Sequence, residues 1–166
     1  GGARDTGVRP HEASGVLAHL AIYSGWPSAV SALDVYDQVY TARKIDTTAL
    51  TATGPRLSAD ASDAARARAV NNEFDAVAPK FAELTNDVVF DDLWRRSDLS
   101  TRDRSLVTIA ALVAGGDDEL EVYLRRGLES GLTRAQISEA VTHVAFYAGW
   151  SKATKAMRAI ARISAK

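Results

Sequence analysis

Two side chains able to move a proton, Glu119 and Tyr123, lie four residues apart in a segment whose apolar residues recur at helical spacing. Residues four apart share one face of an α-helix. If that face is buried, desolvation favours the protonated form of Glu119, which then acts as a general acid while Tyr123 donates to a developing oxyanion. The structural alternatives are a helix N-terminal acid stabilised by the helix dipole, for Glu119, and a core tyrosine, for Tyr123.

A second pair, His143 and Tyr147, shares one face of an alanine-rich, otherwise apolar segment. Histidine titrates near neutrality, so His143 is a candidate proton shuttle and Tyr147 a candidate substrate contact. The same pair occurs near the start of the chain as His19 and Tyr23. Because that copy lacks a counterpart of Glu119, packing explains the duplicated pair slightly better, with histidine bonded to a backbone carbonyl of a neighbouring helix.

Arg104 is the best candidate for holding a substrate carboxylate, since a guanidinium group binds carboxylate through two parallel hydrogen bonds. Its structural alternative is an exposed arginine in a capping turn. His19 and Trp150 are further candidate substrate contacts. Trp150, like Trp26, follows a helix-ending glycine, and both tryptophans fit a helix junction or a subunit contact better than a ligand.

The composition limits the possible partners and cofactors. The 166 residues carry 20 Lys and Arg against 21 Asp and Glu, so the net charge of -1 gives no general reason to bind nucleic acid or an anionic membrane. The absence of cysteine excludes disulfides, thiolate metal sites and cysteine nucleophiles. The three histidines include no pair at ligand spacing, and no Gly-rich phosphate loop follows a strand. We therefore expect neither metal nor cofactor.

The longest apolar stretch, 106–114, is far shorter than the roughly 20 residues that a membrane-spanning helix needs. No charged segment followed by an apolar one opens the chain, so we expect no secretory leader. The sequence thus predicts a cytoplasmic protein.

Capping signals and glycines predict a series of helices. Ser100 and Asp103 form a capping box before a helix that is apolar nearly all round and should be central, and Gly115-Gly116 ends it. A short exposed helix is possible over 61–69. Other helices are predicted from Pro79 through Trp94, from the opening acids 117–119 to Gly131, from the capping box of Thr133 and Gln136 to Gly149, and from about Ser151 to Ile163. No segment shows sustained strand alternation, so the chain is predicted to be all-α.

An internal repeat links the two ends of the chain. The box 19–26 (HLAIYSGW) matches the box 143–150 (HVAFYAGW), and Gly7 aligns with Gly131 at the same offset. The first copy therefore repeats the last two helices of the chain.

The predicted domain organisation follows from this repeat. Residues 7–42 are a partial repeat, 43–69 are a linker rich in small polar residues, and 70–166 are a complete domain. The two repeated helices lack the front of their own domain, so their apolar faces need a partner on the complete domain or on another subunit.

Residues 93–112 (LWRRSDLSTRDRSLVTIAAL) resemble the signature of the carboxymuconolactone decarboxylase family, and the His-x-Ala-x-Tyr-x-Gly-Trp box resembles that of its two-domain and cupin-fused members. The resemblance implies an all-helical fold related to the alkylhydroperoxidase D proteins. The peroxidase motif of those proteins would place its cysteines on Gly116 and Glu119 and its histidine on Tyr123, which rules out that chemistry. The decarboxylases usually keep histidine where Tyr123 stands.

The resemblance further implies a cofactor-free decarboxylation of a small carboxylated lactone of the 4-carboxymuconolactone type, or of another enolisable acid. Glu119, Tyr123 and His143 are then the proton-transfer candidates and Arg104 the anchor. One alternative is a non-catalytic or accessory member that acts by self-assembly or ligand binding. Another is an enzyme of specialised metabolism that uses the same pocket for a different acid–base step. The expected partners are a small carboxylated molecule and further copies of the chain, as a trimer or hexamer, with no nucleic acid and no membrane.

Overall fold

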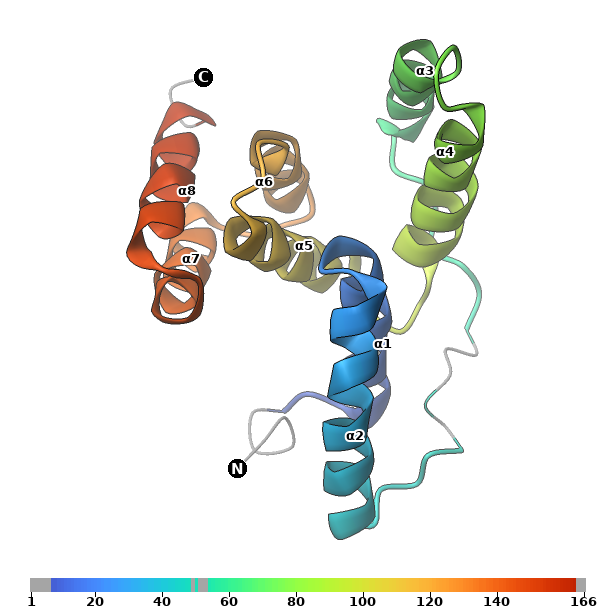
Figure 1. Cartoon of the computed structure of the whole chain (residues 1–166), viewed down its shortest axis with the longest axis vertical. Helices are drawn as coiled ribbons and strands as arrows, with labels where there is room; N and C mark the ends of the chain where they lie inside the picture. Colours follow the sequence, from blue (N-terminus) through green and yellow to red (C-terminus); the bar gives the residue numbers. More distant parts are fainter. Residues whose placement is uncertain (1–6, 49, 51–53, 164–166) are drawn as a thin grey trace. The chain divides into compact units, whose positions relative to one another are not determined.

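The computed structural model describes residues 7–48, 50 and 54–163, and within these ranges it contains eight α-helices and no strand (Figure 1). The all-α prediction is confirmed. The described residues up to Leu50 form one compact unit with those from Leu99 onward, and the residues from 54 to 98 form a second unit. The predicted complete domain, 70–166, thus has parts in both units. Within the predicted linker, residues 49 and 51–53 lie outside the described ranges.

The first unit is built around one central helix. Its helices are α1 (Pro10–Tyr23), α2 (Trp26–Ala42), α5 (Thr101–Gly115), α6 (Leu120–Glu129), α7 (Arg134–Ala148) and α8 (Trp150–Ile163). Helices α1, α6, α7 and α8 all pack against α5 (Figure 1). This arrangement confirms the prediction that the helix following Ser100 is central, and its apolar residues on nearly every side explain why.

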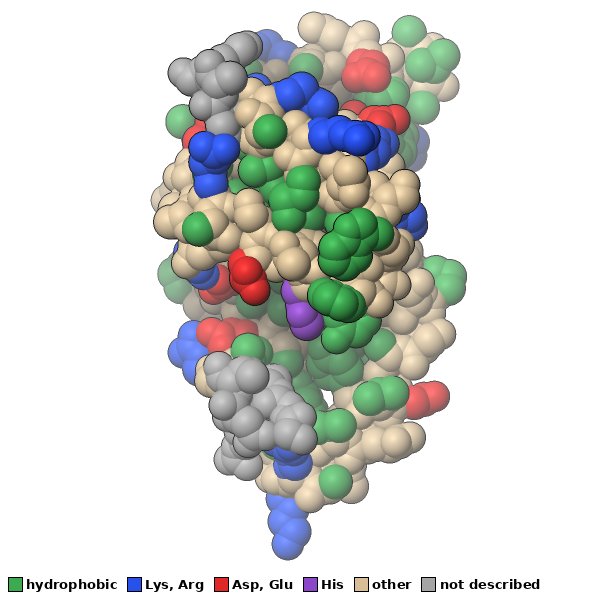
Figure 2. All heavy atoms as spheres, turned by 90° about the vertical axis from the view of Figure 1, so that its left-hand side faces the viewer, with side chains coloured by type: hydrophobic (Ala, Val, Ile, Leu, Met, Phe, Trp, Pro, Cys, Tyr) green, Lys and Arg blue, Asp and Glu red, His purple; other side chains and the backbone are tan. Residues whose placement is uncertain are grey.

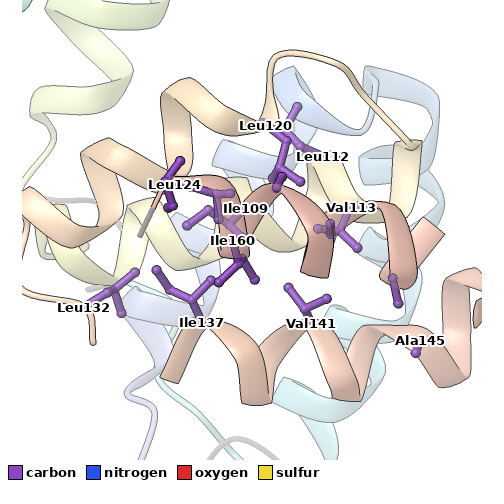
Figure 3. Close-up of a cluster of buried hydrophobic side chains, with 14 residues drawn as sticks. Ile109, Leu112, Val113, Leu120, Leu124, Leu132, Ile137, Val141, Ala145 and Ile160 are labelled. Atoms are coloured by element: carbon purple, nitrogen blue, oxygen red, sulfur yellow. The ribbon is translucent and has the colours of Figure 1, made fainter. Parts of the chain in front are cut away.

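The apolar core of this unit lies where α5, α6, α7 and α8 converge (Figure 3). Burial of branched aliphatic side chains from four helices is the main force that holds α5 and α6 in place. The largest fully buried members of the core are Ile109, Leu124, Ile137, Val113 and Val141.

Local signals set the ends of these helices. The Ser100 hydroxyl accepts a hydrogen bond from the Asp103 amide at 3.1 Å and starts α5, and Gly116 ends it in the left-handed region with a φ of 79°. Thr133 and Gln136 form the predicted reciprocal capping box at the start of α7. Helix α6 begins only at Leu120, after the run of acids. Glu119 is therefore the N-cap residue of α6 and not part of its face.

The hairpins α1–α2 and α7–α8 turn through glycines of the same conformation. Gly25 has φ 90° and ψ 141°, and Gly149 has φ 97° and ψ 147°, a region that favours glycine. The two hairpins differ in their packing. Helix α7 turns Ile137 and Val141 into the core, whereas α1 meets α5 through a face that carries His19. Helix α1 of the repeat thus packs on α5 within the same chain.

The second unit contains α3 (Asp63–Phe74), α4 (Pro79–Leu84), a π-helix (Thr85–Asp92) and a short 3-10 helix (Leu93–Arg95). The prediction of a helix starting at Pro79 is right about its start and wrong about its continuity, because the turns widen at Thr85. The segment after Leu84 holds Thr, Asn, Asp and Val, which are poor α-helix formers. The Arg66 guanidinium lies 3.5 Å from the centre of the Phe90 ring and covers it.

Candidate functional site

A buried polar cluster lies where α1 packs on α5. His19 of α1 places its Nε2 atom 2.7 Å from the Thr108 hydroxyl and its Nδ1 atom 3.4 Å from a terminal nitrogen of Arg104. All three side chains are fully buried, with an exposed fraction of 0%. Polar groups in such a place are tolerated only when they are hydrogen-bonded to one another, so this contact specifies how α1 sits on α5.

The hydrogen-bond directions in this cluster determine the tautomer of His19. The Thr108 hydroxyl donates to the Arg104 carbonyl oxygen at 3.0 Å, so the hydroxyl oxygen can only accept from His19. Arginine is always a donor, so Nδ1 of His19 is an acceptor. The proton of the imidazole is therefore on Nε2. The three residues form a closed ring of hydrogen bonds, from the Arg104 guanidinium through His19 and Thr108 back to the Arg104 backbone.

The same surroundings keep His19 uncharged. Burial, and next the positive charge of Arg104, lower the pKa of His19 from 6.5 to about 3. His19 is consequently a neutral acceptor and donor at neutral pH and has no proton to give as an acid.

Two tyrosine hydroxyls extend the cluster from α1 to α6. Tyr23 stacks on His19 with ring centres 4.8 Å apart, and its hydroxyl lies 3.0 Å from the hydroxyl of Tyr123. The two tyrosine rings meet edge to face at 5.6 Å. Both tyrosines are half-buried, so their hydroxyls lie at the border between the polar interior and water. We call His19, Tyr23, Arg104, Thr108 and Tyr123 the α1–α5–α6 cluster.

The environment of Arg104 differs from the one that its structural alternative predicts. It is not an exposed arginine of a capping turn, because its position on the first turn of α5 faces α1 and the guanidinium is fully buried. The burial of Arg104 also matters for the prediction that its guanidinium holds a substrate carboxylate. The guanidinium is enclosed and bonded to His19, which favours an effect of its charge on a ligand, and a clamp of two direct hydrogen bonds stays a prediction.

Glu119 lies on the surface. It precedes the first residue of α6, its side chain is exposed, and its backbone N–H donates to the Asp117 carboxylate at 2.8 Å. Burial of its face was the condition on which the acid role of Glu119 rested, and the fold does not provide that burial. Tyr123, one turn further on, points to α1.

His143, Tyr147 and Trp150 gather on a different surface, at the corner between α7 and α8. His143 is exposed, Tyr147 is 79% exposed and Trp150 is 64% exposed. His143 contacts Tyr147 at 5.1 Å between ring centres, and Phe146 contacts Trp150 at 5.7 Å. Figure 2 looks onto the face of α7 and α8 and shows hydrophobic side chains gathered beside a histidine. We call His143, Phe146, Tyr147 and Trp150 the α7–α8 aromatic corner.

The structure places the two copies of the repeated histidine in different surroundings. His19 is bonded to a threonine hydroxyl and a guanidinium, because α5 presents these side chains to α1. His143 lies in the exposed aromatic corner. That the repeated histidine also bonds a backbone carbonyl stays a prediction.

Across the described ranges, no three His, Asp or Glu side chains are grouped so that they could hold a metal ion. None of the described helices combines the length and apolar character needed to cross a membrane.

The sequence model of the carboxymuconolactone decarboxylase family matches residues 79–162, about half of the chain. This chain belongs to that family. The matched range includes Arg104, Thr108 and Tyr123, whereas α1 lies outside it. In this member of the carboxymuconolactone decarboxylase family, the cluster therefore joins three residues of the family region to two residues, His19 and Tyr23, from the helix that precedes it.

Two relatives carry decarboxylase names. The 4-carboxymuconolactone decarboxylase of Acinetobacter baylyi is 35% identical over 88 residues, which are 52% of this chain and 60% of the relative. The nitrosuccinic acid decarboxylase of Metarhizium robertsii is 32% identical over 76 residues, 45% of this chain and 53% of that protein. The chain thus spans between half and two thirds of the length of these two family members.

The cluster also holds two residues that sequence reasoning did not select. Thr108 interrupts the apolar run of α5 four residues after Arg104, a spacing that places both on one face. Tyr23 belongs to the repeated box, but no feature of the sequence favoured it over its counterpart Tyr147 as a site residue. The sequence signals were present for both residues, yet nothing in them indicated that α1 and α6 meet.

Proposed function

We propose that this chain is a cofactor-free carboxy-lyase that removes CO2 from a small carboxylated lactone or another enolisable acid. The observation that carries the proposal is the α1–α5–α6 cluster, in which a fully buried guanidinium accompanies half-buried tyrosine hydroxyls. The two relatives support it, since both are named as decarboxylases of small acids.

The chemistry makes one main demand on the site. The C–C bond to the carboxylate breaks, CO2 leaves, and the electron pair moves into an adjacent unsaturated group, where it forms an oxyanion. A proton is then added at carbon. Hydrogen-bond donors and positive charge that are fixed before the reaction lower the barrier to such an oxyanion. Tyr123 supplies the donor and Arg104 the charge.

Each member of the cluster has a separate part in this proposal. Arg104 favours an anionic substrate and its oxyanion through its field, which is strong because the guanidinium is away from bulk water. His19 is neutral and positions Arg104 together with Thr108. Tyr123 contacts the oxyanion and is the nearest candidate in the cluster for returning a proton.

The other predicted site residues stay outside this cluster and are tested separately. Glu119→Gln and His143→Ala examine the two predicted proton-transfer groups, and an unchanged rate in either variant would remove that residue from the mechanism. The His143→Ala test also bears on Tyr147 and Trp150 as predicted substrate contacts, because these residues share the surface of His143. A specialised-metabolism enzyme that catalyses another acid–base step would use the same cluster on a different acid.

We expect the purified chain to release CO2 from at least one small acid in a panel that includes 4-carboxymuconolactone and nitrosuccinic acid. Tyr123→Phe should lower kcat/KM by about tenfold to hundredfold, because one oxyanion donor is lost while the ring is kept. CO2 release and the change in ultraviolet absorbance measure the rate. Ser31→Ala is the control, since the exposed Ser31 hydroxyl donates to the Pro27 carbonyl within α2. The absence of turnover across the panel would contradict the proposal.

A second candidate function, self-assembly in an accessory role, is favoured by the α7–α8 aromatic corner. Phe146 is 76% exposed beside Tyr147 and Trp150, whereas large aromatic side chains are usually covered. Neighbouring exposed aromatic groups mark protein interfaces, where tryptophan and tyrosine contribute most of the binding free energy. A homo-oligomer, a trimer or hexamer by family resemblance, would cover this corner.

Replacing Trp150 with serine should therefore weaken self-association by about thirtyfold or more, the effect of losing a tryptophan at the centre of an interface. Sedimentation velocity at several protein concentrations measures this change. Val122→Ser removes another exposed apolar side chain, 60% exposed on α6, and should leave the association unchanged. A wild-type chain that sediments as a monomer at every concentration would argue against this second function.

A further inference from the structure

We infer that Tyr23 of α1 is a second oxyanion-binding residue and that the Tyr23–Tyr123 hydroxyl pair binds one oxygen of a planar enolate- or nitronate-type anion. The inference rests on the proposed function and deepens it, because it names the group that completes the site and the class of anion bound. It also makes α1, which lies outside the residues that the family model matches, a part of the reaction site.

The geometry of the pair supports this role. The two hydroxyl oxygens are 3.0 Å apart, so one hydroxyl donates to the other. The pair holds two protons, and only one can lie between the two oxygens. An oxyanion within reach of the pair can accept from the second hydroxyl, whose donor strength is raised by the hydrogen bond that its own oxygen accepts. Such a pair is suited to a single, concentrated negative charge.

Helix α1, which carries Tyr23, is held in place at both of its ends. Near its start, the hydroxyls of Tyr36 and Tyr40 on α2 donate to the carbonyl oxygens of Ala13 and Pro10, at 3.1 and 3.0 Å. Near its end, His19 is fixed in the ring of hydrogen bonds with Thr108 and Arg104 and stacks on Tyr23. The Tyr23 hydroxyl is thus positioned before a ligand arrives, which is what electrostatic stabilisation of a developing charge requires.

The repeat provides an internal comparison. Tyr147 occupies the place of Tyr23 in the second copy, but it is 79% exposed in the aromatic corner. A hydroxyl in that place is surrounded by water and has no organised positive environment. The same local sequence therefore gives an oxyanion-binding tyrosine only where α1 meets α5 and α6.

The first test compares Tyr23→Phe with the wild-type chain on the acid that the panel identifies. Loss of the hydroxyl should lower kcat by about tenfold to hundredfold, while the ring keeps its stack on His19. The double variant with Tyr123→Phe should be little slower than the slower single variant, because the two hydroxyls act as one unit. Ser31→Ala, which removes an exposed hydroxyl that donates to the Pro27 carbonyl within α2, is the control and should retain its rate.

The second test needs no turnover. The probe is 4-nitrophenol at neutral pH, whose ionised form absorbs visible light and is a planar oxyanion. The wild-type chain should bind it and increase its ionised fraction, and Tyr23→Phe should weaken binding by about tenfold or more, since a hydrogen bond to a charged oxygen is lost. Ser31→Ala should bind like the wild type.

The two tests separate the inference from the function on which it rests. Probe binding that depends on Tyr23, without turnover of any acid, would support the tyrosine pair as an anion site and reject the carboxy-lyase proposal. Turnover that is unchanged in Tyr23→Phe would overturn the inference and leave the carboxy-lyase in place. A probe that fails to bind the wild-type chain, or that binds Tyr23→Phe equally well, would also overturn the inference.

Discussion

Lowering the pH from 7 to 4 should destabilise the wild-type chain more than the His19→Gln variant. The pKa of His19 is about 3 in the folded chain, whereas histidine in an unfolded chain titrates near 6.5. Between these values the unfolded state binds one more proton, so the stability contributed by neutral His19 is present above pH 6.5 and is lost as the pH falls. The loss amounts to ~1.4 kcal/mol per pH unit, at most about 5 kcal/mol over the whole window.

Urea denaturation at several pH values measures this effect as the difference in the free energy of unfolding between the two proteins. Carboxylates that titrate in the same range are common to both proteins and cancel in the difference. Glutamine offers an acceptor for Arg104 and a donor for Thr108 but no titrating group. His143→Gln controls for the loss of an imidazole at the exposed copy of the box. A difference that does not change with pH would mean that His19 is not held neutral in the interior.

Replacing both His19 and Arg104 should destabilise the fold far less than the sum of the two single replacements. In His19→Leu the buried guanidinium loses an acceptor, at a cost of about 2–4 kcal/mol. In Arg104→Met the buried charge disappears, but the imidazole loses its donor. When both are replaced by apolar side chains of similar size, neither member of the His19–Arg104 hydrogen bond is left without the other, so the cost is smaller than the sum of the two single costs.

A double-mutant cycle of His19→Leu, Arg104→Met and their combination measures the coupling by urea denaturation at neutral pH. We expect a coupling free energy of about 1–3 kcal/mol, the range for residues in one hydrogen-bond network. The pair His19→Leu with Val122→Ala is the control cycle, because Val122 is 60% exposed on α6 and should be additive. Additivity in the first cycle as well would contradict the contact between α1 and α5.

Much of the fold follows from local chemistry in the sequence. The hydroxyl of Ser100 and the reciprocal bonds of Thr133 and Gln136 set two helix starts as predicted, because capping depends on residues within one turn. Gly116 and Gly149 end helices in conformations that other residues adopt only with strain. The widened turns from Thr85 were missed, because apolar spacing does not distinguish an α-helix from a π-helix over so short a segment.

The residue types of the candidate site were also visible in the sequence, since a guanidinium, two histidine–tyrosine boxes and Tyr123 are the groups able to bind anions or move protons. The sequence could not tell which of the two boxes is buried. His19 and His143 have nearly the same neighbours along the chain, so no local rule separates them.

That choice was made by the tertiary structure. Helix α5 offers its Arg104–Thr108 face to α1 and its apolar face to α7, so His19 becomes a neutral, enclosed link and His143 stays in water. The sequence by itself determined most of the helices, several of their ends and the chemical groups available. Burial and the meeting of Tyr23 with Tyr123 depend on contacts between segments 100 residues apart, and only the packing of α1 on α5 and α6 supplies these contacts.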